Sequence, residues 1–159
     1  MYIVHNINNI DSNSFFFGKN INNTVIANGR FTRVLYSTPL YTLNSILLNI
    51  KLNGIKMEKS YIKYKCRFSP GTNRDIIDKI KCIEENILKK ANIDKKRITT
   101  ISDQLRTGLI KIFIDNNARI LNDIILKISG IWETEKEYGI TYKFMFLTKT
   151  PLTVGGEIL

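Results

Sequence analysis

One segment of the chain, SYIKYKCRF from Ser60 to Phe68, alternates between apolar and charged side chains. Because successive side chains of a β-strand point to opposite faces, this pattern predicts a strand with one core face and one charged face. The core face would hold Ile62, Tyr64, Cys66 and Phe68. The other face would hold one ring and three cations, Tyr61, Lys63, Lys65 and Arg67. Charged outer faces are ordinary on half-buried strands, so a solvated surface and a polyanion-binding surface are equal alternatives here.

Two more strands are expected before this segment. Residues 30–36 are interpreted as a strand with mixed faces, and residues 44–52 as a strand with an apolar inner face and a partly polar outer face. Pro39 separates them because proline cannot donate a hydrogen bond to a sheet. Residues 18–29 indicate loop and turn around a short strand at 24–27, closed by the hairpin signal Asn28-Gly29. Three adjacent rings, Phe15 to Phe17, cannot all face one core. They are interpreted as an arm buried against the sheet, with docking on a partner as the alternative.

Residues 73–92 change to the period of an α-helix. Four isoleucines at spacings of four, three and four residues form an apolar stripe, Ile76, Ile80, Ile83 and Ile87. The outer face is expected to be acidic, and so a poor surface for nucleic acid, because it carries Asp78, Glu84 and Glu85. Residues 93–107 are polar and are interpreted as an irregular loop with solvated cations.

Strands resume at Leu109. If the isoleucines of residues 110–114 face inward, Lys111 and Phe113 share the outer face. Two longer strands then form a hairpin, and its last strand places Lys143 outward. The connection is expected to be an exposed turn that contains Glu133, Glu135 and Glu137. Trp132 has the parity of Leu126 and Ile128, so it is expected to pack in the core or at its rim.

This order of elements predicts a mainly β fold, an OB-fold-like antiparallel barrel with one amphipathic helix (about 73–92) between the third and fourth core strands. An α+β sandwich with a helix across one face would give the same order. The length of 159 residues suits a single core. The expected parts are an N-terminal arm and first strand at 1–28, the OB-like barrel at 29–147 and a flexible tail at 148–159.

Charge changes the picture of the outer face. The net charge is +10, and residues 1–70 hold nine basic and two acidic residues, whereas residues 71–159 hold fifteen and twelve. The electropositive surface is therefore expected in the first half, where the SYIKYKCRF strand lies. Heavy use of Asn, Ile and Lys is also typical of an AT-rich genome, which raises the lysine count for reasons other than binding.

The sequence gives no indication of a metal site, an enzyme or a membrane protein. Cys66 and Cys82 lack CxxC spacing and are interpreted as reduced, and His5 is the only histidine, which leaves almost no ligands for a metal. The chain has no GxxxxGK[ST], GxSxG or HExxH sequence, so neither an enzyme nor a cofactor is expected. It has no long apolar segment and no leader pattern, so we expect an intracellular, reducing compartment without membrane association.

Three segments carry a resemblance: RFTRVLYSTPLYTLNSILLNIKL, SYIKYKCRF and ISGIWETEKEYGITYKF. Over about residues 29–147 they resemble the small OB-fold single-stranded DNA-binding proteins of phages and nucleocytoplasmic large DNA viruses. The resemblance implies an accessory of replication, recombination or repair that coats single strands in a virus-infected host cell, in a cytoplasmic factory or the nucleus. The acidic tail of the phage proteins is missing, since Glu157 is the only acid after Pro151.

The candidate binding residues combine cations for phosphates with rings for bases. The main set is Tyr61, Lys63, Lys65, Arg67, Lys111 and Phe113, followed by Arg30, Arg33 and Lys143. They predict non-specific binding of single-stranded DNA, with RNA as an alternative ligand and a homo-oligomer as an alternative state. The alternative function is a virion structural or scaffolding protein that acts through protein contacts. Catalytic and metal-binding residues are not expected.

Overall fold

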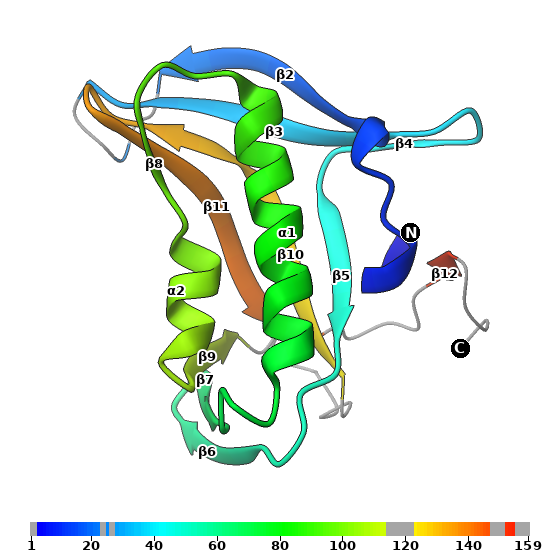
Figure 1. Cartoon of the computed structure of the whole chain (residues 1–159), viewed down its shortest axis with the longest axis vertical. Coiled ribbons are helices and arrows are strands. Elements are labelled where there is room, and N and C mark those ends of the chain that lie inside the picture. Colours follow the sequence, from blue (N-terminus) through cyan, green and yellow to red (C-terminus); the bar gives the residue numbers. More distant parts are fainter. Residues whose placement is uncertain (1–2, 23–24, 26–27, 114–122, 147–151, 155–159) are drawn as a thin grey trace.

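The computed structural model describes residues 3–22, 25, 28–113, 123–146 and 152–154. These residues form a mainly β structure with two α-helices (Figure 1). The helices are α1 (Arg74–Ala91) and α2 (Thr100–Arg106), and short 3-10 turns occupy Ile7–Asn9 and Ser12–Ser14. The strands are β1 (Ile3–Asn6), β2 (Phe15–Asn22), β3 (Arg30–Ser37), β4 (Thr42–Leu43), β5 (Ile46–Ile50), β6 (Lys56–Ser60), β7 (Lys63–Arg67), β8 (Lys96–Ile98), β9 (Leu109–Phe113), β10 (Ile124–Glu133), β11 (Glu137–Met145) and β12 (Leu152–Val154).

All the described strands join one sheet around the β10–β11 hairpin. Residues Ile124 to Ile128 of β10 pair with β5, and Gly130 to Glu133 pair with β3. The start of β11 pairs with β8 and its end with β9. Because β10 and β11 are longer than their neighbours, each end of the hairpin has different partners. In Figure 1, β2, β3 and β4 consequently lie at one end of the molecule and β6, β7 and β9 at the other.

The sheet differs from the expected antiparallel barrel. Its main path runs β12-β1-β5-β10-β11-β9-β7-β6, and its two ends do not pair with each other in the described part of the chain, so the sheet is open. Four strand pairs are parallel: β1–β5, β1–β12, β8–β11 and β9–β11. The last two arise because α2 carries the chain from the start of β11 to its end between β8 and β9.

The N-terminal residues belong to this same sheet. Strand β1 lies between β5 and β12, and β2 pairs with β3. Strand β2 extends to Asn22, where a loop was expected, because its backbone finds a partner in β3 that local sequence does not show. Of the expected short strand at 24–27, only Val25 is a described residue; the tail lies outside the described residues except for β12.

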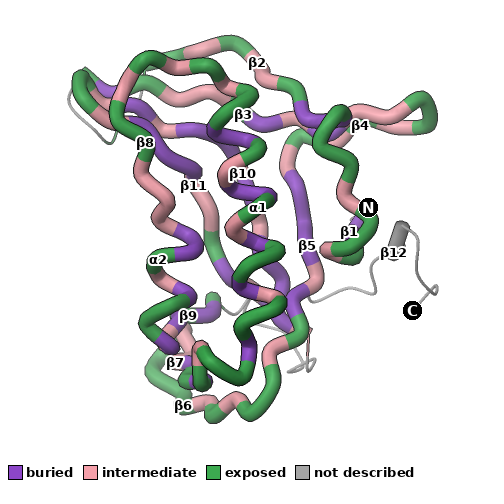
Figure 2. Tube along the Cα trace, viewed as in Figure 1, coloured by how far each residue is buried: buried purple, intermediate pink, exposed green. Residues whose placement is uncertain are grey.

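The main core lies between the sheet and the two helices (Figure 2). The helix expected at 73–92 is confirmed as α1, and Ile80, Ile83 and Ile87 are buried as the stripe predicts. Helix α2 falls where an irregular loop was expected. Ile101 and Leu105, four residues apart, are fully buried against this core, but seven residues give too short a pattern to predict a helix.

Glu84 is buried, in contrast to the acidic outer face expected for α1. Its carboxylate accepts hydrogen bonds from the backbone N–H groups of Ile101 and Ser102, at 2.8 and 3.0 Å, and from Ser102 Oγ at 2.5 Å. The first N–H groups of a helix have no partners within the helix, and the positive end of its dipole favours an anion. Glu84 therefore caps α2 and joins the two helices through the core.

We expect Glu84→Ala to lower the free energy of unfolding by about 2–4 kcal/mol, because two buried N–H groups would lose their acceptor. Urea unfolding measures this loss. The neighbouring Glu85→Ala is a matched control: Glu85 lies on the same helix in an exposed pair with Lys81, at 3.8 Å. Such pairs contribute at most about 1 kcal/mol. Equal effects of the two substitutions would contradict the capping role.

The same site has a pH signature, because burial raises the pKa of Glu84 above its usual value of 4.5. A raised pKa means that the folded state holds the proton more tightly than the unfolded state. The stabilisation that comes from protonation of Glu84 is therefore fully present below the unfolded pKa, and it is lost as pH rises through the folded pKa. Glu84→Gln should abolish this component, which is measured as the difference in stability between the two proteins as a function of pH.

Candidate nucleic-acid interface

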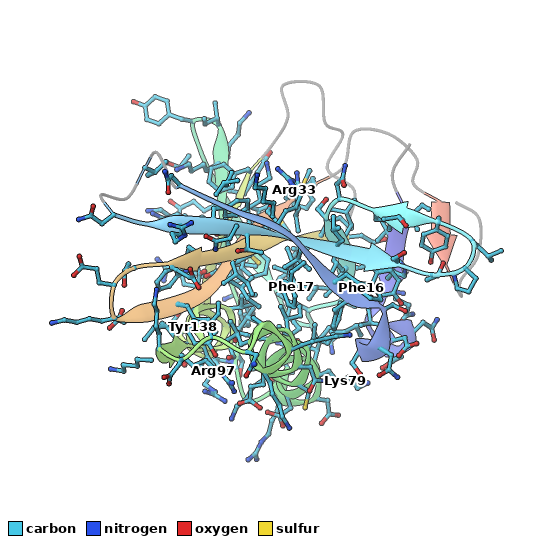
Figure 3. The ribbon with its side chains drawn as sticks, turned by 90° about the horizontal axis from the view of Figure 1, so that it is seen from above. Phe16, Phe17, Arg33, Lys79, Arg97 and Tyr138 are labelled. Carbon is cyan, nitrogen blue, oxygen red and sulfur yellow. The ribbon has the colours of Figure 1, made fainter. Side chains whose placement is uncertain are left out.

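The sheet has one face covered by helices and one face without them. Helices α1 and α2 lie over the same side of β5, β10 and β11 (Figure 1). In Figure 3, Arg33 points from β3 to the opposite side, whereas Tyr138, Arg97 and Lys79 lie on the helix side. We call the side of the sheet on which Arg33 lies the helix-free face. Opposite residues on paired strands share a face, so the register shows which side chains belong to it.

Strands β7 and β9 bring four of the candidates together. Lys63 lies opposite Phe113, and Lys65 lies opposite Lys111. Lys63 Nζ is 4.8 Å from the centre of the Phe113 ring, within the range of a cation–π contact. Phe113 remains 39% exposed, so its ring is accessible from solvent. A cation–aromatic surface is thus built from two strands that are far apart in sequence.

The helix-free face continues from β9 across the central hairpin. Phe113 lies opposite Met145 of β11. Lys143 comes two residues before Met145, on the same face, and lies opposite Lys127 of β10. Burial, followed by the nearby charges of Lys143 and Arg33, lowers the pKa of Lys127. Lys127 was not among the candidates, because its neighbours become visible only through the strand register. Three cations therefore crowd one another at the centre of the face.

Tyr61 lies at the tip of the β6–β7 hairpin and not within the expected strand. The strand begins at Lys63, and Tyr61 has a positive φ of 53° in the turn. Tyr61 is 95% exposed, and Ile62, expected in the core, is 62% exposed. The alternating pattern continued through two residues that the backbone uses to turn, which explains the error.

Arg67 and Arg30 have different positions relative to this surface. Arg67 ends β7 on the helix-free face and is exposed. Arg30 lies opposite Glu133, on the face of Tyr138, and its Nε donates to Asn20 Oδ1. Arg33 and Arg30 are three residues apart on one strand and so point to opposite faces. The structure therefore separates Arg30 from the other candidates.

Trp132 was expected in the core or at its rim, and it lies on the helix-free face near the end of β10, outside the core. The register shifts between Ile128 and Gly130, so the parity of β10 reverses after this β-bulge. Ile131 then faces the core, while Trp132 lies opposite Gly139 and is partly exposed. The same reversal buries Glu133, which was expected in an exposed turn; it lies 4.0 Å from Lys95 Nζ.

The cations of the helix-free face have few acidic neighbours. Glu58 of β6 lies opposite Lys65, the one acid found in direct register with a candidate cation on this face among the described strands. In the described part of the chain, the ion pairs are Lys81–Glu85, Lys95–Glu133 and Arg106–Asp103. All three pairs involve other residues. The face therefore keeps an excess of positive charge among the described residues, with Glu58 as the acid in register.

Other kinds of site have no counterpart among the described residues. They contain no group of three or more metal-binding side chains, and none of their helices is long and apolar enough to cross a membrane. His5 is buried, and its Nε2 lies 3.0 Å from the Tyr41 hydroxyl; burial lowers its pKa.

The chain was also compared with protein-family models, with curated proteins and with solved structures. None of these three comparisons gives a match.

The crowding of cations leads to a stability prediction. Like charges directly opposite each other on a sheet are destabilising. We expect Lys143→Gln to raise the free energy of unfolding by about 0.2–1 kcal/mol at low salt, because the repulsion with Lys127 is removed. The gain should shrink as salt screens the charges. Lys79→Gln is the control, because Lys79 lies at an exposed position of α1. A gain of equal size there would contradict local repulsion as the cause.

Proposed function

We propose that this protein binds single-stranded nucleic acid, with single-stranded DNA as the first candidate, on the helix-free face. The observation that carries the proposal is the assembly of Lys63, Lys65, Lys111 and Lys143 beside Phe113 from three neighbouring strands, without an ion pair among the described residues. Clustered cations that form no ion pairs raise the free energy of the unbound protein. A polyanion would relieve that cost.

Single strands suit this surface better than a duplex does. Lysines bind phosphates without reading bases, and exposed rings offer stacking to bases of any sequence. In a duplex the bases are already stacked and paired, so the ring of Phe113 would gain little. The resulting preference is for unpaired strands and is largely independent of sequence. By the resemblance described above, the proposal extends to a strand-coating role in viral DNA replication, recombination or repair.

A structural or scaffolding protein is the second candidate function. It is favoured by large apolar side chains exposed away from the lysine cluster, on β2 and in the turn before β4: Phe16 at 49%, Ile21 at 51% and Leu40 at 89%. Such residues are suited to contacts with another protein. Assembly through them would depend little on salt, whereas binding to phosphates would weaken steeply as salt rises.

Titration of fluorescent oligo(dT) with the protein, at several salt concentrations and with a duplex competitor, tests the proposal. We expect tight binding that weakens with salt and little competition from the duplex, because phosphates release counterions and unpaired bases stack. Equal competition by the duplex would reduce the activity to general adhesion of a basic protein. Absence of binding at low salt would overturn the proposal and leave the structural role.

Substitutions then separate charge from stacking. Lys65→Gln and Lys111→Gln should each weaken binding and reduce the salt slope by about one, because each removes one phosphate contact. Phe113→Ala should weaken binding by about 1–3 kcal/mol with the salt slope unchanged. Tyr61→Ala tests the hairpin tip in the same assay. Lys79→Gln is the charge control, because Lys79 lies at an exposed position of α1 on the other side of the sheet. A loss of affinity there as large as that for Lys111→Gln would contradict a binding face.

A further inference from the structure

Two aromatic rings at the β3 end of the helix-free face lie directly against glycine backbone. A Cβ added to Gly130 would lie 2.5 Å from Cζ of Phe31, and one added to Gly139 would lie 2.7 Å from Cζ2 of Trp132. Both distances are below 3.0 Å, a separation that real Cβ atoms essentially never show, so a side chain at either position would clash with the ring; at Gly130 it would also meet the Thr32 carbonyl oxygen, at 2.4 Å. The absence of a side chain at these two positions lets the rings rest on the sheet.

The register places these rings side by side on the same face. Phe31 lies opposite Trp132, which lies opposite Gly139 on the other side, and Gly130 lies opposite Arg33. Both rings are partly exposed. Arg33 is exposed, with its Cζ 6.0 Å from the centre of the Phe31 ring. The pair therefore combines aromatic surface with an adjacent cation, as the Lys63–Phe113 pair does.

We infer that Phe31 and Trp132 form a second stacking site for the single strand whose binding is proposed above, and this inference rests on that function. Rings backed by the sheet are held in place before binding, so little conformational entropy is lost when a base stacks on them. Arg33 and Lys127 would hold the flanking phosphates. A ring that only covered a glycine would not need unneutralised cations beside it.

The two stacking sites are far enough apart to require an extended strand. Phe113 lies opposite Met145 of β11, and Trp132 lies opposite Gly139 of the same strand. The two sites are therefore six residues apart along β11. A rise of about 3.3 Å per residue and a strand spacing of about 4.8 Å give a separation of roughly 22 Å. Lys143, Lys127 and Arg33 lie between them. One oligonucleotide can therefore reach both sites, and a dinucleotide cannot.

The chain has a single tryptophan, so its fluorescence reports this site alone. The experiment titrates the full-length protein with oligo(dT) of about 12 nucleotides, a length within the usual footprint of such proteins. Anisotropy of a labelled strand and Trp132 fluorescence are recorded on the same samples. We expect tryptophan quenching with the same midpoint as the anisotropy change, and a much weaker response with a dT dinucleotide.

Variants give the second readout. Trp132→Leu and Phe31→Leu should each weaken binding by about five- to a hundredfold, the effect of losing one stacked base, whereas Trp132→Phe should retain most of the affinity. Phe16→Leu is the matched control, since Phe16 is exposed and has Lys90 Nζ 5.1 Å from its ring, but beside α1. Circular dichroism of each variant verifies that it is folded.

The outcomes separate the two proposals. Binding with coincident quenching, and loss on Trp132→Leu but not on Phe16→Leu, supports the second site. Binding without quenching, with Trp132→Leu as tight as the parent, overturns the second site and leaves the proposed function standing. Absence of binding by anisotropy overturns both. Quenching by the dinucleotide that matches the longer strand would overturn the extended path between the sites.

Discussion

The pairing of β10 with β11 is the constraint on which the rest of the structure depends. These strands are the longest of those described, and every other layer is placed by them. Strands β5 and β3 share β10, strands β8 and β9 share β11, and both helices pack on the face that Tyr138 and Phe144 provide. Two ends with different partners produce an open sheet with distinct surfaces at its two ends.

The buried carboxylate of Glu84 has a comparable role for the helical layer. A charged group is costly to bury, and this one is accepted because the N-terminus of α2 supplies donors that would otherwise lack partners. One contact therefore offsets the cost of burying the carboxylate and the cost of leaving the N–H groups of α2 without an acceptor. Since the contact fixes α2 against α1, it also fixes the connection between β8 and β9, and so the position of β9 on which Lys111 and Phe113 lie.

Local periodicity was a good guide where the backbone is regular. Alternation placed Lys63, Lys65, Lys111 and Phe113 on outer faces, and the isoleucine stripe predicted α1, because both patterns depend on near neighbours in sequence. Register, in contrast, depends on strands far apart in sequence, and it decided that Lys127 joins the face while Arg30 leaves it. The errors at Tyr61 and Glu84 also come from features that the local pattern does not contain: the backbone turns at Tyr61, and the N-terminus of α2 supplies hydrogen-bond donors to Glu84.

The β-bulge in β10 has a consequence for how such a surface can arise. One extra residue between Ile128 and Gly130 exchanges the roles of the positions that follow, so that Ile131 faces inward and Trp132 outward. Point substitutions would have to alter several positions at once to achieve this, and the intermediates would carry polar groups in the core. A single-codon insertion moves them together while the hydrophobic composition stays the same. Insertions and deletions in sheet strands are therefore a short evolutionary route by which a purely architectural tryptophan can become accessible to ligands.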